Sequence, residues 1–196
     1  MKKALIFCSV VFFVSSLIFA ERNAKQTPQK VLTTNILGLA FGSINATYEM
    51  PCRMCKGNNK TTALSGSLFS MKTGDWSLTA IGLGAERRIY PNDEIFKGFY
   101  YSPSLGVAIV SAKYKYEELS GTFPFYTIEE KEESSSGFFL GLGFNIGYQW
   151  IMKDGLTIGL GIGVGYTIGS LEVAGEKAPY GGFGLSKLSI DVGYAW

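Results

Sequence analysis

Histidine is absent from this chain of 196 residues, and its absence excludes several kinds of site. Neither a Ser-His nor a His-Asp catalytic dyad can form without the imidazole that accepts a proton. A zinc site of the usual Cys and His composition is also short of ligands, because the chain has only three Cys. We therefore expect no catalytic residues, no metal site and no cofactor, and the chain is predicted not to be an enzyme.

Charge and long apolar runs are scarce as well. Charged residues make up 17% of the chain, and the formal net charge is +2. Without Lys2 and Lys3 this charge is close to zero, which gives no electrostatic case for binding nucleic acid. Beyond the first twenty positions no apolar segment is long enough for a membrane-spanning helix.

The N-terminus has the pattern of a secretory signal peptide. Lys2 and Lys3 precede an apolar run from 4 to 19, and the small Ala20 stands before a polar segment. The alternative is an N-terminal membrane anchor, but the run is short for one and lacks a basic flank. We expect a signal peptide at 1–20, a periplasmic lead-in at 21–30 and one folded domain at 31–196.

Glycine is abundant, with 25 residues, and it alternates with large apolar residues. In segment 156–168, one parity is Leu, Ile, Val and Tyr, and the other is Gly and Thr. A strand separates two such sets onto opposite faces, whereas a helix would mix them. The same alternation predicts strands at 61–71, 77–90, 99–110, 138–150 and 186–196, with Pro103 marking a bulge or a lost ladder bond.

The strand number follows from a parity argument. A closed antiparallel barrel requires an even number, because its first and last strands must pair with each other. Segment 31–50 is long for one strand, and dividing it near Gly42 raises the total from seven to eight. The sequence therefore predicts an all-β protein, a closed antiparallel barrel of eight strands.

The composition of the two faces distinguishes a membrane barrel from a soluble one. The outer face of a soluble ligand-binding barrel meets water and carries many Lys and Glu. Here the face opposite the apolar side chains in 138–150 and 156–168 is Gly, Thr, Asn and Gln, which suits a narrow interior. The continuous Leu, Ile, Val and aromatic face suits lipid. We therefore expect a transmembrane β-barrel in the outer membrane of a bacterium with two membranes.

Polar residues on the inward parity predict a network that fills the lumen, since buried charges must be paired. Its members are Glu49, Glu86, Arg88, Asn145, Gln149, Lys187 and Asp191. A paired acid and base acting as a site is the less favoured interpretation. The inward glycines either make room for large side chains such as Phe139 and Tyr100, or leave a groove for an amphiphile.

Three further groups of residues stand out. Aromatic residues at strand ends predict contacts with the membrane interface: Phe99, Tyr101, Tyr148, Trp150, Tyr194 and Trp196. Cys52 and Cys55 lie in a predicted loop, where a disulfide is favoured over free thiols or a redox or metal role.

The longest predicted connection, 113–136, holds three Lys and six Glu and is placed outside the cell. It is interpreted either as a solvated extension of two strands or as a recognition surface. The candidate contact residues for an unidentified partner are Phe123, Phe125, Tyr126, Glu129 and Glu130.

Four short motifs stand out along the chain: Thr34-Asn35-Ile36-Leu37, Lys97-Gly98-Phe99-Tyr100, Gly147-Tyr148-Gln149-Trp150-Ile151 and Gly163-Val164-Gly165-Tyr166. On these motifs the chain resembles the small eight-stranded outer-membrane barrels of OmpA/OmpX-like architecture and, more narrowly, a family of uncharacterised outer-membrane barrels. This resemblance implies no catalytic residues. It also implies that the terminal Trp196 is read by the outer-membrane assembly machinery.

Together these patterns predict a non-enzymatic outer-membrane barrel with a self-filled lumen and a structural or adhesion-like role through its extracellular loops, chiefly 113–136. The alternative is a barrel that binds or transports a small amphiphile through its Gly-lined interior. A lipid-modifying enzyme has only fold analogy in its favour.

Overall fold

The computed structural model describes residues 28–52, 55, 57, 59–92, 94–122, 125–173 and 176–196. The predicted signal peptide, residues 21–27 of the predicted lead-in, and Phe123 lie outside the described residues. Within the described part, the chain forms eight strands and one short helix, α2 (Ile36–Ala40). The strands are β1 (Val31–Asn35), β2 (Ser43–Pro51), β3 (Lys60–Thr73), β4 (Trp76–Ile89), β5 (Gly98–Thr122), β6 (Phe125–Ile151), β7 (Leu156–Val173) and β8 (Glu176–Ala195).

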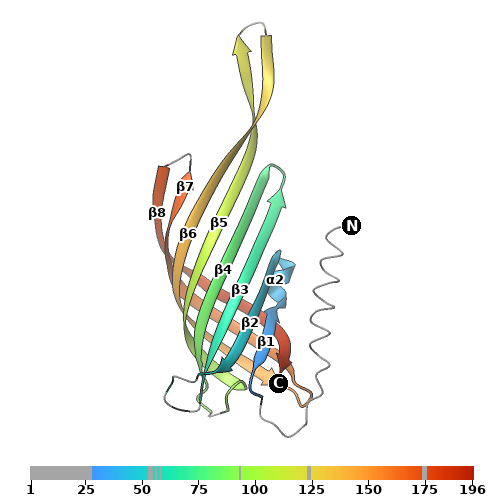
Figure 1. Cartoon of the computed structure of the whole chain (residues 1–196), viewed down its shortest axis with the longest axis vertical. Coiled ribbons are helices and arrows are strands. Elements are labelled where there is room, and N and C mark those ends of the chain that lie inside the picture. Colours follow the sequence, from blue (N-terminus) through green and yellow to red (C-terminus); the bar gives the residue numbers. More distant parts are fainter. Residues whose placement is uncertain are drawn as a thin grey trace.

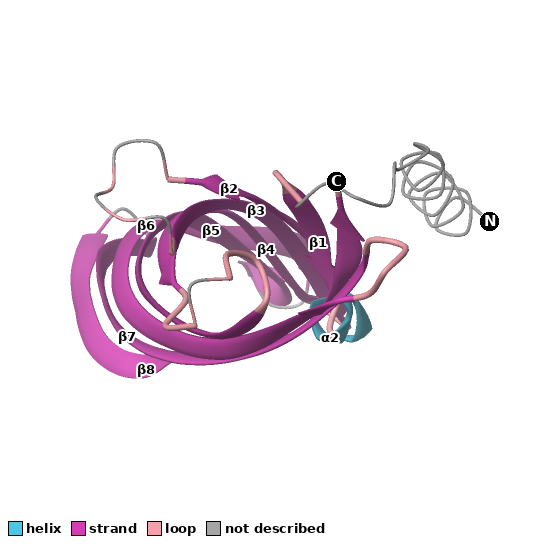
Figure 2. Cartoon of the chain, turned by 90° about the horizontal axis from the view of Figure 1, so that it is seen from below, coloured by secondary structure: helices cyan, strands magenta, loops and turns pink. Residues whose placement is uncertain are grey.

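The sheet closes on itself. Each strand pairs antiparallel with the next, and β1 pairs with β8, so that Val31 lies opposite Ala195. Seen from below, the strands form a ring (Figure 2). The prediction of an all-β fold of eight antiparallel strands in a closed ring is confirmed.

The two ends of the barrel differ. We call the end where Val31 and Ala195 meet the terminal end. The other, the hairpin end, carries the extension of β5 and β6, which project far beyond their neighbours (Figure 1). β5 has 25 residues and β6 has 27, and they stay paired from Gly98 and Gln149 up to Thr122 and Phe125.

Segment 31–50 is divided as the parity argument required, but by a helix that the sequence did not predict. The Asn35 side chain accepts hydrogen bonds from the backbone N–H groups of Leu37 and Gly38, and so caps the N-terminus of α2. Gly42 then adopts a positive φ of 81°, which glycine tolerates without strain, and β2 begins at Ser43. In the part of the chain that the structure describes, no helix is long and apolar enough to cross a membrane.

Of the two interpretations of 113–136, the extension of two strands agrees with the structure, because most of this predicted connection is strand. β5 continues to Thr122, and β6 begins at Phe125. Residues 171–173 and 176–182, for which the alternation predicted no strand, belong to β7 and β8. In the β5–β6 extension the alternation of apolar residues with glycine gives way to charged and Ser residues, and in 171–182 it gives way to a mixed composition with Glu, Lys, Ala and Pro, so the pattern that located the other strands is missing.

One β-bulge interrupts the register between β7 and β8. Gly163 pairs with Lys187, whereas the next residue, Val164, pairs with Leu185. Ser186 is therefore the extra residue, and a bulge of this kind brings two successive side chains to the same face. Pro103 causes no register shift, but the β4–β5 ladder skips the positions between Ser104 and Tyr101.

Candidate functional site

The terminal half of the lumen is filled by a polar cluster centred on Arg88. Its Nη1 donates to Glu49 Oε2 at 2.8 Å and to Gln149 Oε1 at 3.1 Å. Its guanidinium carbon also lies 4.6 Å from the centre of the Tyr100 ring, a cation–π arrangement. Arg88, Glu49 and Gln149 are each at most 2% exposed. Three strands far apart in sequence, β2, β4 and β6, thus meet across the interior.

Glu49 is the main acceptor of this cluster. Besides Arg88, it accepts hydrogen bonds from the hydroxyls of Thr61 and Tyr90 and from Gln149 Nε2. A buried carboxylate with this many donors has its charge compensated. We call the group formed by Glu49, Thr61, Arg88, Tyr90, Tyr100 and Gln149 the plug.

Phe96 adds an apolar cap to the plug that sequence reasoning missed. It lies in the β4–β5 loop, is fully buried, and packs with Val31 and Ala195. Its carbonyl accepts a hydrogen bond of 2.7 Å from Gln149 Nε2. Phe96 also has a φ of 70°, unusual for a residue that is not glycine. The sequence signal that could have identified Phe96 is the presence of an aromatic residue in a loop next to a predicted strand end.

A second ion pair lies above the plug. Lys187 Nζ donates to Glu86 Oε1 at 2.8 Å, and Arg88 Nε reaches Glu86 Oε2 at 3.3 Å. The structure therefore brings together Glu49, Glu86, Arg88, Gln149 and Lys187 of the sequence-predicted network. The other two members, Asn145 and Asp191, face the same interior but bond to serines, through Ser186 Oγ at 3.3 Å and Ser189 Oγ at 3.0 Å.

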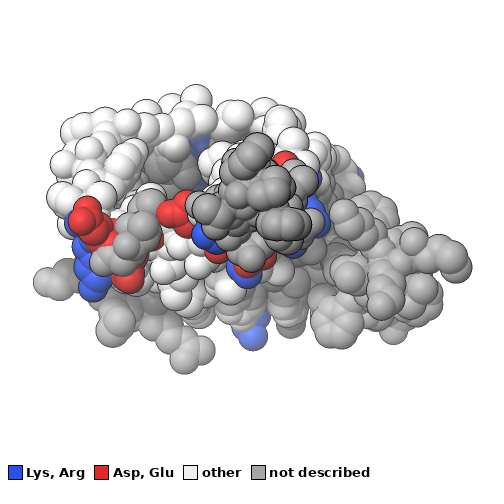
Figure 3. Space-filling view, turned by 90° about the horizontal axis from the view of Figure 1, so that it is seen from above, with Lys and Arg blue, Asp and Glu red and all other residues white. Residues whose placement is uncertain are grey.

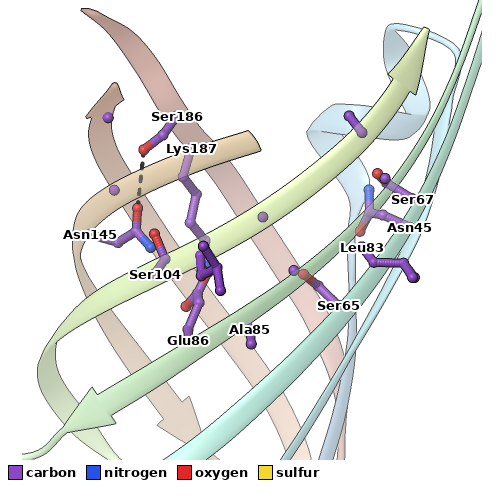
Figure 4. A pocket seen from close by; sticks show the side chains of 18 of the residues that line it. Asn45, Ser65, Ser67, Leu83, Ala85, Glu86, Ser104, Asn145, Ser186 and Lys187 are labelled. Carbon is purple, nitrogen blue, oxygen red and sulfur yellow. Dashed lines mark hydrogen bonds and ion pairs between the residues drawn. The ribbon is translucent and has the colours of Figure 1, made fainter. Parts of the chain in front are cut away.

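The hairpin half of the lumen is hollow. A cavity of about 520 Å³, which we call the cup, lies above the plug and is lined mainly by Ser, Gly, Asn and Thr. In Figure 4, Ser65, Ser104 and Ser186 line the cup, and Lys187 reaches down to Glu86. The sequence predicted a self-filled lumen, and the hairpin half differs because serine and glycine side chains are too short to meet across it.

In the terminal half, the inward glycines make room for large side chains, which is the first of the two roles considered for them from the sequence. A Cβ on Gly147 would lie 2.5 Å from the Tyr100 hydroxyl oxygen and 2.6 Å from the Leu160 carbonyl oxygen. On Gly184, in the hairpin half, it would meet nothing within 4 Å. Gly147 therefore accommodates Tyr100 in the plug, whereas Gly184 borders open space.

Asn35 holds neighbouring elements together at the end of β1, where β1 pairs with β8. Its Nδ2 donates to the Leu188 carbonyl at 3.0 Å, and its Oδ1 accepts from the Ile190 N–H at 3.2 Å. Its own N–H donates to Asn45 Oδ1 at 2.8 Å. Asn35, which forms the last β1–β8 pair, thus connects β8 and α2 through its side chain and β2 through its backbone, and it also lines the cup.

Aromatic residues gather at the terminal end. The Tyr148 and Trp150 ring centres lie 4.4 Å apart, and Trp196 lies 6.5 Å from Tyr194 and 6.4 Å from Tyr48. Phe99 is exposed, and Tyr101 stacks on Phe144 at 6.1 Å. Gln29 and Lys30 of the predicted lead-in donate backbone hydrogen bonds to the Trp196 carbonyl.

Cys52 and Cys55 form a disulfide in the β2–β3 loop. Of the predicted partner-contact residues, Phe125, Tyr126, Glu129 and Glu130 belong to β6, but their side chains lie outside the described part. Among the described residues no group of three or more His, Cys, Asp or Glu could hold a metal ion.

Charged side chains at the hairpin end lie in two groups, one beside the projecting strands and one at the edge of the ring on the side of β7 and β8 (Figure 3). Lys113 Nζ donates to Glu132 Oε1 at 2.7 Å, and both side chains are partly exposed. This hydrogen bond and the Lys113 charge lower the pKa of the Glu132 carboxyl.

These features define a class: a closed eight-stranded antiparallel barrel with a plugged terminal half and an open cup at the other end. Within that class, the chain belongs to the family described as "Protein of unknown function (DUF3575)", whose model matches residues 8–173. No curated protein and no solved structure matches the chain.

Proposed function

We propose that the protein is a non-enzymatic β-barrel of a bacterial outer membrane, without an open pore, that presents its β5–β6 hairpin for contact at the cell surface. The observation that carries this proposal is the outward face of the strands. Large apolar side chains are exposed around the ring, including Ile81, Leu83, Leu105, Leu142, Ile162 and Leu188. A continuous apolar belt of this kind is unfavourable in water and favourable in lipid.

The interior supports the same proposal. The plug and the cup are polar, and the apolar side chains point outward, which is the inverse of a soluble barrel. The aromatic residues at the terminal end fit a membrane–water interface, where amphipathic rings are enriched. Outer-membrane lipid is thus the proposed surrounding, and the assembly machinery that reads Trp196 is a proposed partner.

Heat-modifiability tests the membrane barrel. A closed barrel in the outer-membrane fraction should resist SDS until boiled, so boiled and unboiled samples should migrate differently. Protein recovered from the soluble periplasm with no mobility difference would contradict the proposal.

Because the plug blocks the lumen, planar-bilayer recordings should show no stable conductance, and nanosiemens steps would contradict the closed lumen. No turnover of lipid A or phospholipid is expected.

Protease cleavage of intact cells tests the proposed orientation. The hairpin strands project beyond the ring and carry Lys115 and Lys131, whereas Lys153 lies in the turn at the opposite end. Trypsin added to intact cells should cut at Lys115 or Lys131 and spare Lys153 until the outer membrane is permeabilised. Cleavage at Lys153 alone would mean the reverse orientation.

A second candidate function is binding of a small amphiphile, which the cup favours. Its volume of about 520 Å³ lies within the range of small-molecule sites, roughly 300–1,000 Å³. Since the plug closes the other half of the lumen, this would be binding from the hairpin end and not passage through the barrel.

A further inference from the structure

The two faces of the strands exchange their polarity along the barrel. On β5, the outward residues Leu105, Val107 and Ile109 are apolar, but the next outward residues are Ser111 and Lys113. The pairing of β5 with β6 continues through this point without a register shift. The exchange is therefore a change in composition, and it marks the upper limit of the apolar belt.

Around this limit and above it the inward face becomes apolar. Residues on the inward parity there include Phe69, Leu78, Val110, Tyr114, Phe139 and Tyr180, of which Phe139 also lines the cup. The rings of Tyr114 and Trp76 lie 4.6 Å apart, and those of Phe139 and Tyr180 lie 5.9 Å apart. The interior thus has an apolar, aromatic mouth above a polar cup.

The floor of the cup carries an excess of negative charge. Its ionisable lining residues are Glu86, Asp191 and Lys187, two carboxylates against one ammonium. Lys187 pairs with Glu86, and below them Arg88 pairs with Glu49. Asp191 has no ion pair within the described part and accepts a hydrogen bond from Ser189, although it is only 8% exposed. A buried carboxylate without a cation favours a cationic ligand.

We propose that the cup binds a small amphiphilic amine, with its ammonium group at the floor beside Asp191 and its apolar or aromatic body against the mouth. This inference rests on the second candidate function and gives the ligand class for it. An ammonium donates to carboxylate and serine oxygens, both of which the floor supplies. Aromatic rings at the mouth suit both the apolar body and a passing cation.

The experiment uses the full mature barrel in lipid nanodiscs and three probes of similar size: phenethylamine, 2-phenylethanol and 3-phenylpropionate. Binding is measured by calorimetry, and empty nanodiscs of the same lipid correct for partitioning. Phenethylamine should bind at least about tenfold more tightly than 2-phenylethanol, and 3-phenylpropionate should not bind measurably. Equal binding of all three probes would overturn the proposal.

Two matched pairs of variants locate the site. Asp191→Asn keeps the side-chain shape and should weaken phenethylamine about tenfold while leaving 2-phenylethanol unchanged. Its control is Asp154→Asn in the exposed β6–β7 turn, which should change nothing. Val110→Thr on the inward face should weaken both probes, and Thr79→Val on the outward face should weaken neither. An unchanged phenethylamine affinity in Asp191→Asn would overturn the assignment.

The same preparation separates this inference from the proposed function. If the nanodisc protein is heat-modifiable but binds no probe, the ligand class is wrong and the membrane barrel stands. If it shows no heat-modifiability, the barrel proposal itself fails. Light scattering at the same concentrations checks for a second copy seated on the mouth, and a dimer that prevents probe binding would count against the proposal.

Discussion

The two halves of the lumen are built from the same eight strands with the same alternation, yet one is filled and the other is hollow. In the terminal half, long side chains such as Arg88, Gln149 and Tyr100 reach across the interior and meet. In the hairpin half, the inward positions hold Ser65, Ser104 and other short residues, and a cavity of about 520 Å³ remains.

This difference shows that two properties of a period-two sequence are independent: which side of the wall a residue faces, and whether the inward side chains close the lumen. Alternation decides which side of the wall a residue faces, and it is the same in both halves. The length and bonding of the inward side chains decide whether the lumen closes. A barrel of eight strands is narrow enough to be filled by its own side chains, but only where those side chains are long.

Removing the centre of the plug should have the largest effect. Arg88→Ala leaves Glu49 buried without its cation, and loss of one partner of a buried pair costs about 3–5 kcal/mol. The free energy of unfolding, measured by urea titration in lipid, should fall by that amount. Arg87→Ala on the outward face of the same strand is the control and should cost far less. An unchanged midpoint for Arg88→Ala would refute a structural plug.

A charge in the apolar belt should have the next largest effect. Leu142 is 62% exposed on the outward face of β6, so Leu142→Arg would place a cation in lipid at a cost of about 2–4 kcal/mol. Ser136→Arg lies on the same face of the same strand above the polarity exchange, where the cost should be about 0–1 kcal/mol. Equal losses, measured by unfolding in vesicles, would place both residues in one environment and remove the proposed limit of the belt.

A methyl group on the lumen side should have the smallest effect and should distinguish the two halves most directly. Gly147→Ala forces Tyr100 out of its place in the plug, and overpacking of this kind typically costs about 1–3 kcal/mol. Gly184→Ala points into open space and should leave the free energy of unfolding nearly unchanged. If the two substitutions cost the same, the hairpin half is as closely packed as the plug.

Much of the architecture could be predicted because it depends on local pattern. The alternation in 138–150 and 156–168 located strands and their faces, and strand parity then required the break that α2 provides. The alternation did not mark the strand extensions above residues 110 and 168, because their composition no longer alternates apolar with small. For 113–136 an extension of two strands was therefore only one of two interpretations. Phe96 and Asn35 escaped it because their contacts, with Gln149 and with Leu188, join distant segments.

By itself the sequence determined the eight strands and the inward and outward sets of residues, because a strand of period two assigns faces without reference to the rest of the chain. The inward set includes Glu49, Glu86, Arg88 and Asp191. Only the tertiary structure decided which inward residues meet. Closure of the ring brings Glu49 to Arg88 and leaves Asp191 beside the cup, since bonding across the lumen depends on the register of all eight strands at once.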